Sequence, residues 1–156
     1  MSKVMVVIGS GSDKEKIEPC LDTLTALKID YKLFIRSAHR TPEETADLAK
    51  TAISQGYSVI IAAAGMAAAL PGCLAAHTIL PVIGVPLNAS PLTGLDALYA
   101  TVQMPSGVPV AVVAIDGAKN AGILAAQILA VSNSELAAQL VRFKQDMARD
   151  VMAANN

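Results

Sequence analysis

The sequence has few of the residues on which several protein classes depend. Only two cysteines, Cys20 and Cys73, occur among its 156 residues, and tryptophan is absent. Two cysteines are too few for a disulfide framework or a zinc site, so we expect both to be core residues of a protein in a reducing cytoplasm. Aromatic residues make up 3% of the chain. So few rings argue against an electron-transfer flavodoxin, which needs aromatic side chains around its flavin.

The chain also lacks an excess of either charge. It has 12 Lys and Arg against 13 Asp and Glu, which gives a formal net charge of −1. Scattered charges of this kind form no footprint for nucleic acid or for an anionic membrane. Residues 1–3 do not open a basic and then apolar leader, so no signal peptide is expected. The two histidines have no metal-ligand spacing to the cysteines, and we expect no metal site.

One long stretch, residues 51–95, has no Asp, Glu, Lys or Arg at all. A membrane span would be an unbroken apolar segment, but this stretch is divided by Gly56, Gly65, Pro71, Gly72, Pro81, Gly84 and Pro86. We therefore predict buried strands and a buried helix near Leu70–Leu80. Because that helix has no obvious polar face, we expect it to pack against another subunit, with His77 as a packed or interface histidine.

Strand-like and helix-like segments alternate along the chain. Strands are predicted near Lys3–Ile8, Tyr31–Ile35, Val59–Ala63, Val82–Val85 and Val110–Ala114, and helices near Lys14–Leu27, Pro42–Gln55, Leu70–Leu80, Leu95–Val102 and Ala118–Val131. A last helix near 134–153 presents one apolar stripe, formed by Leu136, Leu140, Phe143, Met147 and Val151. The strands lack the alternation of a half-exposed sheet. They therefore indicate a single α/β domain over residues 1–156, with a parallel sheet covered on both faces.

A polar turn follows the first predicted strand and contains Ser10, Ser12 and Asp13. It lacks the third glycine of a dinucleotide fingerprint, and the chain has no P-loop. Amides and hydroxyls at a helix start suit a phosphate, and Asp13 could accept from ribose hydroxyls. Ser and Asp are equally ordinary helix caps, so the turn alone leaves both interpretations open.

A second polar turn, Ser37–Pro42, follows the second predicted strand. Ligands of open α/β sheets bind at that edge. His39 could act there as a general acid and base near neutral pH, and Arg40 could hold a phosphate. We favour catalysis over a structural role for His39. Thr41 is predicted as the cap of the next helix, with Pro42 in its first turn and Glu44 completing a capping box.

Several motifs, taken together and in order, resemble the carboxyaminoimidazole ribonucleotide mutase (PurE) family. They are Gly-Ser-x-Ser-Asp at 9–13, Ser-Ala-His-Arg-Thr-Pro at 37–42, Ala-Gly at 64–65 through Leu-Pro-Gly at 70–72, Pro-Val-Ile-Gly-Val-Pro at 81–86, Val-Gln-Met-Pro at 102–105, and the segment 120–129. The resemblance implies a three-layer α/β/α sandwich of flavodoxin or Rossmann type and a homo-octamer. It also implies an isomerase of purine (IMP) biosynthesis that uses no metal, biotin or ATP.

The resemblance assigns roles to particular residues. His39 protonates the leaving carbamate nitrogen of the aminoimidazole ribonucleotide, and it takes the proton of ring C4 after that carbon is carboxylated. The ribose and phosphate are held by Ser10, Ser12, Asp13, Ser37 and Arg40. Ala64 and Gly65 let the backbone approach the carboxylate, and Leu70 is the remaining substrate contact.

Two features depart from the mutase pattern. Ala69 stands where mutases of this family usually have histidine, and residues 104–107 and 116–120 look like the related carboxylases, which take free carbon dioxide. Arg40 and Leu-Pro-Gly at 70–72 favour the mutase. The alternatives are a CO2-dependent carboxylase and an inactive nucleotide-binding relative. A phosphoreceiver domain is disfavoured because the third strand ends in Ala62–Gly65, with no aspartate.

Overall fold

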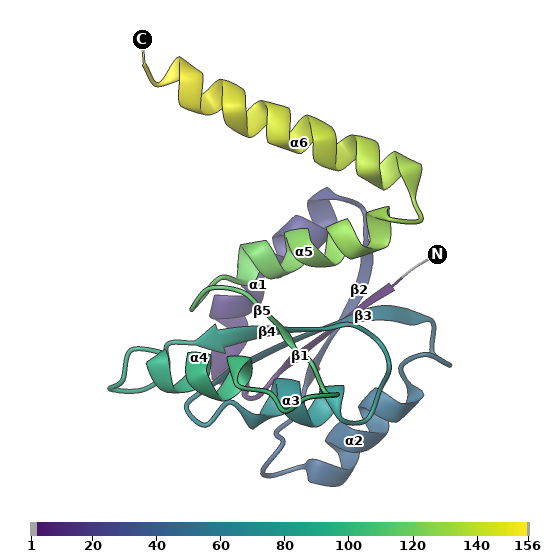
Figure 1. The fold of residues 1–156 in the computed structure, drawn as a ribbon, viewed down its shortest axis with the longest axis vertical. Helices are drawn as coiled ribbons and strands as arrows, with labels where there is room; N and C mark the ends of the chain where they lie inside the picture. Colours follow the sequence, from purple (N-terminus) through teal and green to yellow (C-terminus); the bar gives the residue numbers. More distant parts are fainter. Residues whose placement is uncertain (1–2, 156) are drawn as a thin grey trace.

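A five-stranded parallel sheet forms the centre of the structure, a computed structural model that describes residues 3–155 (Figure 1). Its strands are β1 (Lys3–Ile8), β2 (Asp30–Ile35), β3 (Tyr57–Gly65), β4 (Val82–Leu87) and β5 (Ala111–Val112). They lie in the order β2-β1-β3-β4-β5, and every neighbouring pair is parallel. This is the doubly wound, flavodoxin-like order, in which the direction of winding reverses between β1 and β3.

Helices cover both faces of the sheet and give the three layers that were predicted. They are α1 (Lys14–Ala26), α2 (Pro42–Thr51), α3 (Ala69–Ala75), α4 (Leu95–Val102), α5 (Ala118–Ala130) and α6 (Ser134–Ala153), with a short 3₁₀ turn, η1 (Gly11–Asp13), before α1. Alternate residues of β1 enter different cores. Val4 and Val6 pack with α1 and α5, whereas Met5 and Val7 pack with α2, α3 and α4. All four are fully buried, which explains the strand pattern without polar alternation.

The cysteines divide between core and periphery. Cys20 is fully buried, and burial raises the pKa of its thiol to about 12. It is the core residue that was expected. Cys73 is half-buried, and burial raises its pKa as well.

The third helix is shorter than predicted. It ends at Ala75 rather than Leu80, and His77 follows it as an exposed residue with Nδ1 2.8 Å from Cys73 O. A residue before proline is disfavoured in a helix, and Pro81 follows this segment. Ile79 is 92% exposed. The interpretation of His77 as packed within the chain is therefore wrong.

The start of α2 also differs from the prediction. Pro42 lies in the first turn, but neither Thr41 nor Glu44 forms the predicted capping box, because α2 has no side-chain cap. The Thr41 hydroxyl instead accepts from Ser37 N at 2.9 Å and donates to Ser37 O at 3.0 Å. It therefore closes the preceding turn rather than the helix.

The last helix extends away from the sheet (Figure 1). Asn133 caps it by accepting from Leu136 N at 3.1 Å. Of the predicted stripe, Leu136 and Leu140 are buried, but Met147 is 45% and Val151 is 68% exposed. The chain itself thus covers the beginning of the stripe and leaves its end uncovered. Among residues 3–155, no helix is both long enough and apolar enough to cross a membrane.

Candidate active site

The predicted site residues meet in one cavity of about 590 Å³ at the carboxyl edge of the sheet. Loops after β1, β2, β3 and β4 surround it, across the place where the winding reverses. Every residue that was predicted to bind or react lines this cavity: Ser10, Ser12, Asp13, Ser37, His39, Arg40, Ala64, Gly65 and Leu70. The fold therefore brings together segments that are more than fifty residues apart in sequence.

The loop after β1 forms a capping box around η1. Ser10 N donates to Asp13 Oδ2 at 3.0 Å, and Ser12 N donates to Ser10 Oγ at 3.4 Å. The cap interpretation is thus confirmed, and the same residues also line the cavity. Burial raises the pKa of Asp13, opposed by the Ser10 amide and by the charge of Lys16. A buried carboxylate is stabilised by hydroxyl donors, which a ribose would supply.

The loop after β2 holds its arginine by a side-chain bond. Ser37 Oγ accepts from Arg40 N at 3.2 Å and from Arg40 Nε at 3.3 Å. Because this bond uses Nε, the two terminal nitrogens of the guanidinium can serve an anion as a fork. His39 precedes Arg40 on the same turn and is exposed, so its imidazole is accessible to a ligand in the cavity.

The loop after β3 builds a wall from backbone and small side chains. A Cβ placed on Gly65 would lie 2.5 Å from Ala89 Cβ, so no larger residue fits where these two loops meet. Ala68 has a left-handed backbone (φ 39°) and donates from its N to Gly65 O at 3.0 Å. Ala69 brings a methyl group to the cavity. A planar carboxylate could lie close to such a wall.

Ala89 is the cavity residue that lies outside every motif found in the sequence. It lies in the loop after β4 and lines the cavity directly beside Gly65. The available signal was its place shortly after the predicted strand Val82–Val85, where ligand loops of this fold begin. Alanine carries no functional group, so chemistry alone could not identify it.

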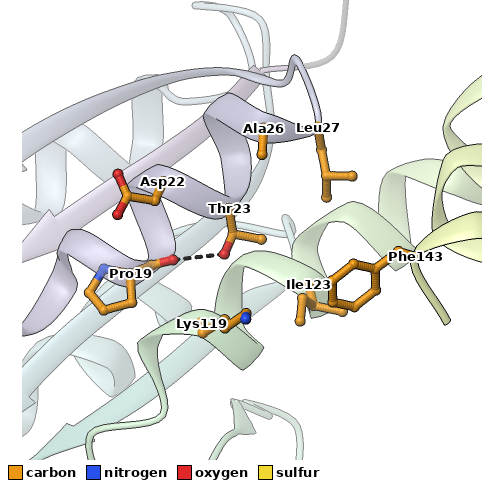
Figure 2. Close-up of a pocket in the computed structure, with 8 residues that line it drawn as sticks. All are labelled: Pro19, Asp22, Thr23, Ala26, Leu27, Lys119, Ile123 and Phe143. Atoms are coloured by element: carbon orange, nitrogen blue, oxygen red, sulfur yellow. Dashed lines mark hydrogen bonds between the residues drawn. The ribbon is translucent and has the colours of Figure 1, made fainter. Parts of the chain in front are cut away.

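A second cavity of about 400 Å³ lies between α1, α5 and α6 (Figure 2). Its lining is mostly apolar and includes Leu27, Ile123 and Phe143. The hydroxyl of Thr23 donates to Pro19 O at 2.7 Å, within its own helix. None of the predicted site residues line this cavity. Within residues 3–155 no three or more His, Cys, Asp or Glu residues gather where they could hold a metal ion.

The chain resembles proteins of one family over nearly its whole length. The family model AIR carboxylase matches residues 3–150. The N5-carboxyaminoimidazole ribonucleotide mutase of Thermotoga maritima is 50% identical over 152 residues, which cover 97% of this chain and 89% of that protein. The mutase of the same name from Saccharolobus solfataricus is 50% identical over 153 residues, covering 98% of this chain and 97% of that protein.

Two further relatives differ from these mutases, one in its name and the other in its lower sequence identity. The phosphoribosylaminoimidazole carboxylase of Schizosaccharomyces pombe is 50% identical over 149 residues, which cover 96% of this chain but 27% of that protein. The crystal structure of Treponema denticola PurE aligns with a TM-score of 0.90 at 28% identity, covering 98% of this chain and 96% of that one. On the family match and the extent of these identities, the chain belongs to the AIR carboxylase family.

Proposed function

We propose that this chain is an N5-carboxyaminoimidazole ribonucleotide mutase of purine biosynthesis. Such an isomerase moves a carboxylate from the exocyclic nitrogen to ring C4 of an aminoimidazole ribonucleotide. The observation that carries the proposal is the convergence of the Ser10–Asp13 turn, the Ser37–Arg40 turn and the Ala64–Leu70 wall in one cavity. Mutases from two organisms that are each 50% identical to this chain support the same substrate class.

The two polar turns bind the ribose and phosphate in this proposal. Arg40, oriented by Ser37, pairs with the phosphate, and Ser10 and Ser12 donate hydroxyl hydrogen bonds. Asp13 accepts from the ribose diol. These contacts do not change during the reaction, so they serve substrate and transition state alike.

His39 moves the protons. It protonates the carbamate nitrogen, the C–N bond breaks with its electron pair left on nitrogen, and carbon dioxide forms inside the cavity. Ring C4 then attacks that carbon dioxide and forms the new C–C bond. The C4 proton passes to His39, which returns the imidazole to its starting state.

The second candidate is a carboxylase that takes free carbon dioxide. Ala69 supports it, because a methyl group stands at the wall where the mutase pattern has an imidazole. The carboxylase from Schizosaccharomyces pombe is as similar to this chain as the mutases are. Arg40 and Leu70 both line the site and keep the mutase pattern, so the mutase remains the better supported function.

A labelling experiment separates the two reactions. The carbamate substrate is labelled in its carboxylate and supplied with excess unlabelled bicarbonate. A mutase retains the label in its product, because the carbon dioxide does not leave the cavity. Complete loss of label, with a rate that follows dissolved carbon dioxide, identifies the carboxylase. Ala69→His should raise mutase turnover if the missing imidazole limits the reaction, whereas no gain would mean that the wall is adapted to the smaller residue.

We further propose that the chain acts as one catalytic domain, residues 1–156, within a cytoplasmic homo-octamer. The support is apolar surface that one chain leaves uncovered, at Ile79 on one side and along Met147 and Val151 of α6 on another. The apolar cavity beside Phe143 adjoins the same helix (Figure 2). Patches of this kind on soluble proteins mark contacts with other chains.

A further inference from the structure

The carboxyl edge of the sheet is bridged by one long-range ion pair that the mechanism above does not use. Lys16 Nζ, on α1, lies 3.4 Å from both carboxylate oxygens of Asp116, which follows β5. The other ion pairs among residues 3–155, Asp47 with Lys50 and Asp146 with Arg149, join neighbours three residues apart on exposed helical surface. Only the Lys16–Asp116 pair therefore connects separate parts of the fold.

The pair binds both polar backbone groups of a single residue. Lys16 Nζ donates to Asn88 O, and Asn88 N donates to Asp116 Oδ1 at 3.0 Å. Asn88 comes directly after β4, where ladder hydrogen bonding ends. The two charged side chains thus replace the strand partners that this peptide no longer has.

The loop is also held at its other end and from its side. Ser90 Oγ donates to Asp96 Oδ2 at 2.7 Å, at the start of α4. Gly94 has a left-handed backbone (φ 89°), and a Cβ there would lie 3.3 Å from Asn88 Cα. Ala89, between the two anchored residues, is the one that packs on Gly65 at the cavity wall.

We propose that Lys16 and Asp116 are a positioning pair, which fixes the Asn88–Ser90 loop so that Ala89 holds the Gly65 wall of the cavity. Neither residue lines that cavity. Asp116 therefore acts through the loop, whereas the charge of Lys16 also opposes the rise in the pKa of Asp13. The inference rests on the proposed function, in which this wall borders the carboxylate during its transfer. A loosened wall would let carbon dioxide escape or lie at the wrong angle, while the phosphate and ribose contacts on the other side would remain.

The pair therefore predicts a particular kinetic pattern. Asp116→Ala, which keeps the charge of Lys16 near Asp13, should lower kcat by about 10- to 100-fold, the scale of a small misplacement of reacting groups, and change KM by less than about twofold. Lys16→Met should lower kcat to the same extent but also raise KM, because it removes the charge that acts on Asp13. Label retention in the experiment described above should fall as well. Lys16→Arg keeps a cationic donor and should restore kcat to within about threefold of wild type. The matched control is Lys50→Met, which removes an exposed ion pair and should leave both constants unchanged.

Charge reversal separates positioning from simple attraction. The double variant Lys16→Asp/Asp116→Lys keeps two opposite charges but presents a carboxylate to the Asn88 carbonyl and an ammonium to its N–H. If the pair positions the loop, this variant stays as slow as Lys16→Met although it remains folded in a thermal melt. Recovery of kcat to within about twofold of wild type would overturn the proposal, because charge attraction alone would then suffice.

Amide exchange tests the same pair without turnover. The Asn88 amide should exchange at least about tenfold faster in Asp116→Ala than in wild type, while amides of β1 keep their protection. Absence of mutase turnover in the wild-type protein would count against the proposed function. The exchange rate of the Asn88 amide would still test whether Lys16 and Asp116 position the loop. An Asn88 exchange rate that is the same in Asp116→Ala and in wild type would overturn the positioning role. Turnover at the wild-type rate in every variant would also overturn it.

Discussion

His39 lies on an exposed turn next to Arg40, and it lines the same cavity as the wall of alanine and glycine residues. If it moves the protons of the reaction, His39→Asn should slow turnover by at least about a hundredfold, the usual scale of lost acid and base catalysis. The variant should stay folded and still bind the product nucleotide, which calorimetry can measure. Near-normal turnover would contradict the assignment.

Arg40 should behave in the opposite way. Its guanidinium is oriented by Ser37, and a phosphate contact is equally strong in the ground state and in the transition state. Arg40→Ala should therefore raise KM by about tenfold or more and leave kcat nearly unchanged. Steady-state kinetics would check this, and a fall in kcat alone would place Arg40 in the chemistry instead.

Asp13 makes the stability of the protein depend on pH. Burial raises its pKa above the ordinary value of 3.8, so the folded state favours the protonated acid. At neutral pH the ionised carboxylate therefore lowers the free energy of unfolding. The contribution of this group to stability is complete below pH 3.8 and is lost as the pH rises through the folded pKa. Asp13→Asn should therefore melt at a higher temperature than wild type at pH 7, while losing activity.

The difference between Asp13→Asn and wild type should shrink as the pH falls towards 3.8, because the wild-type acid then becomes protonated too. Thermal melts across that range, compared with the exposed control Asp47→Asn, would show it. A difference that does not depend on pH would mean that burial of the charge is not its cause.

At this scale the chemistry-bearing residues could be found from the sequence, and the supporting ones could not. Ser10, Asp13, His39 and Arg40 stand in short turns after predicted strands, so their place follows from local pattern. Lys16 and Asp116 are a hundred residues apart and meet only because β1 and β5 point the same way in one sheet. No local signal in the sequence records such a meeting.

The elements were predicted well in their interiors and less well at their ends. Apolar runs identified every strand of the sheet, because strands buried on both faces need no polar alternation. Apolar runs alone did not mark the end of α3 at Ala75 or the short span of β5 at Ala111–Val112. For Thr41, local pattern indicated a helix cap, but the hydroxyl bonds backward to the Ser37 peptide.

The turn before α2 should therefore depend on that hydroxyl. Thr41→Val removes both bonds to the Ser37 backbone and should lower the free energy of unfolding by about 1–2 kcal/mol. Thr51→Val is the matched control, because the Thr51 hydroxyl donates to Asp47 O on the exposed side of the same helix. Denaturant titration would measure both. An equal decrease in the free energy of unfolding in both variants would show that the Thr41 hydroxyl does not stabilise the Ser37 turn specifically.

For the whole molecule, the uncovered apolar surface predicts assembly. Light scattering at micromolar concentration should give a mass of about eight times the 16.1 kDa of one chain. Val151→Asp or Ile79→Asp should reduce that mass, because each places a charge on a surface that one chain leaves bare. Ser54→Asp, at an exposed polar turn, should not. A wild-type mass of one chain would contradict the proposal.

The strand order also governs when each part of the structure can form. β1 pairs with both β2 and β3, so the first three strands can associate as soon as residues 3–65 have left the ribosome. One face of that half-sheet is completed only when α5, which supplies Ala121 and Ala125 to its core, has been made. The edge of β3 has no neighbour until β4 has been made, which happens before α5. Parallel pairing across such intervals is slow and exposes strand edges to other chains, so synthesis of residues 66–126 is the interval in which this protein is most vulnerable to aggregation.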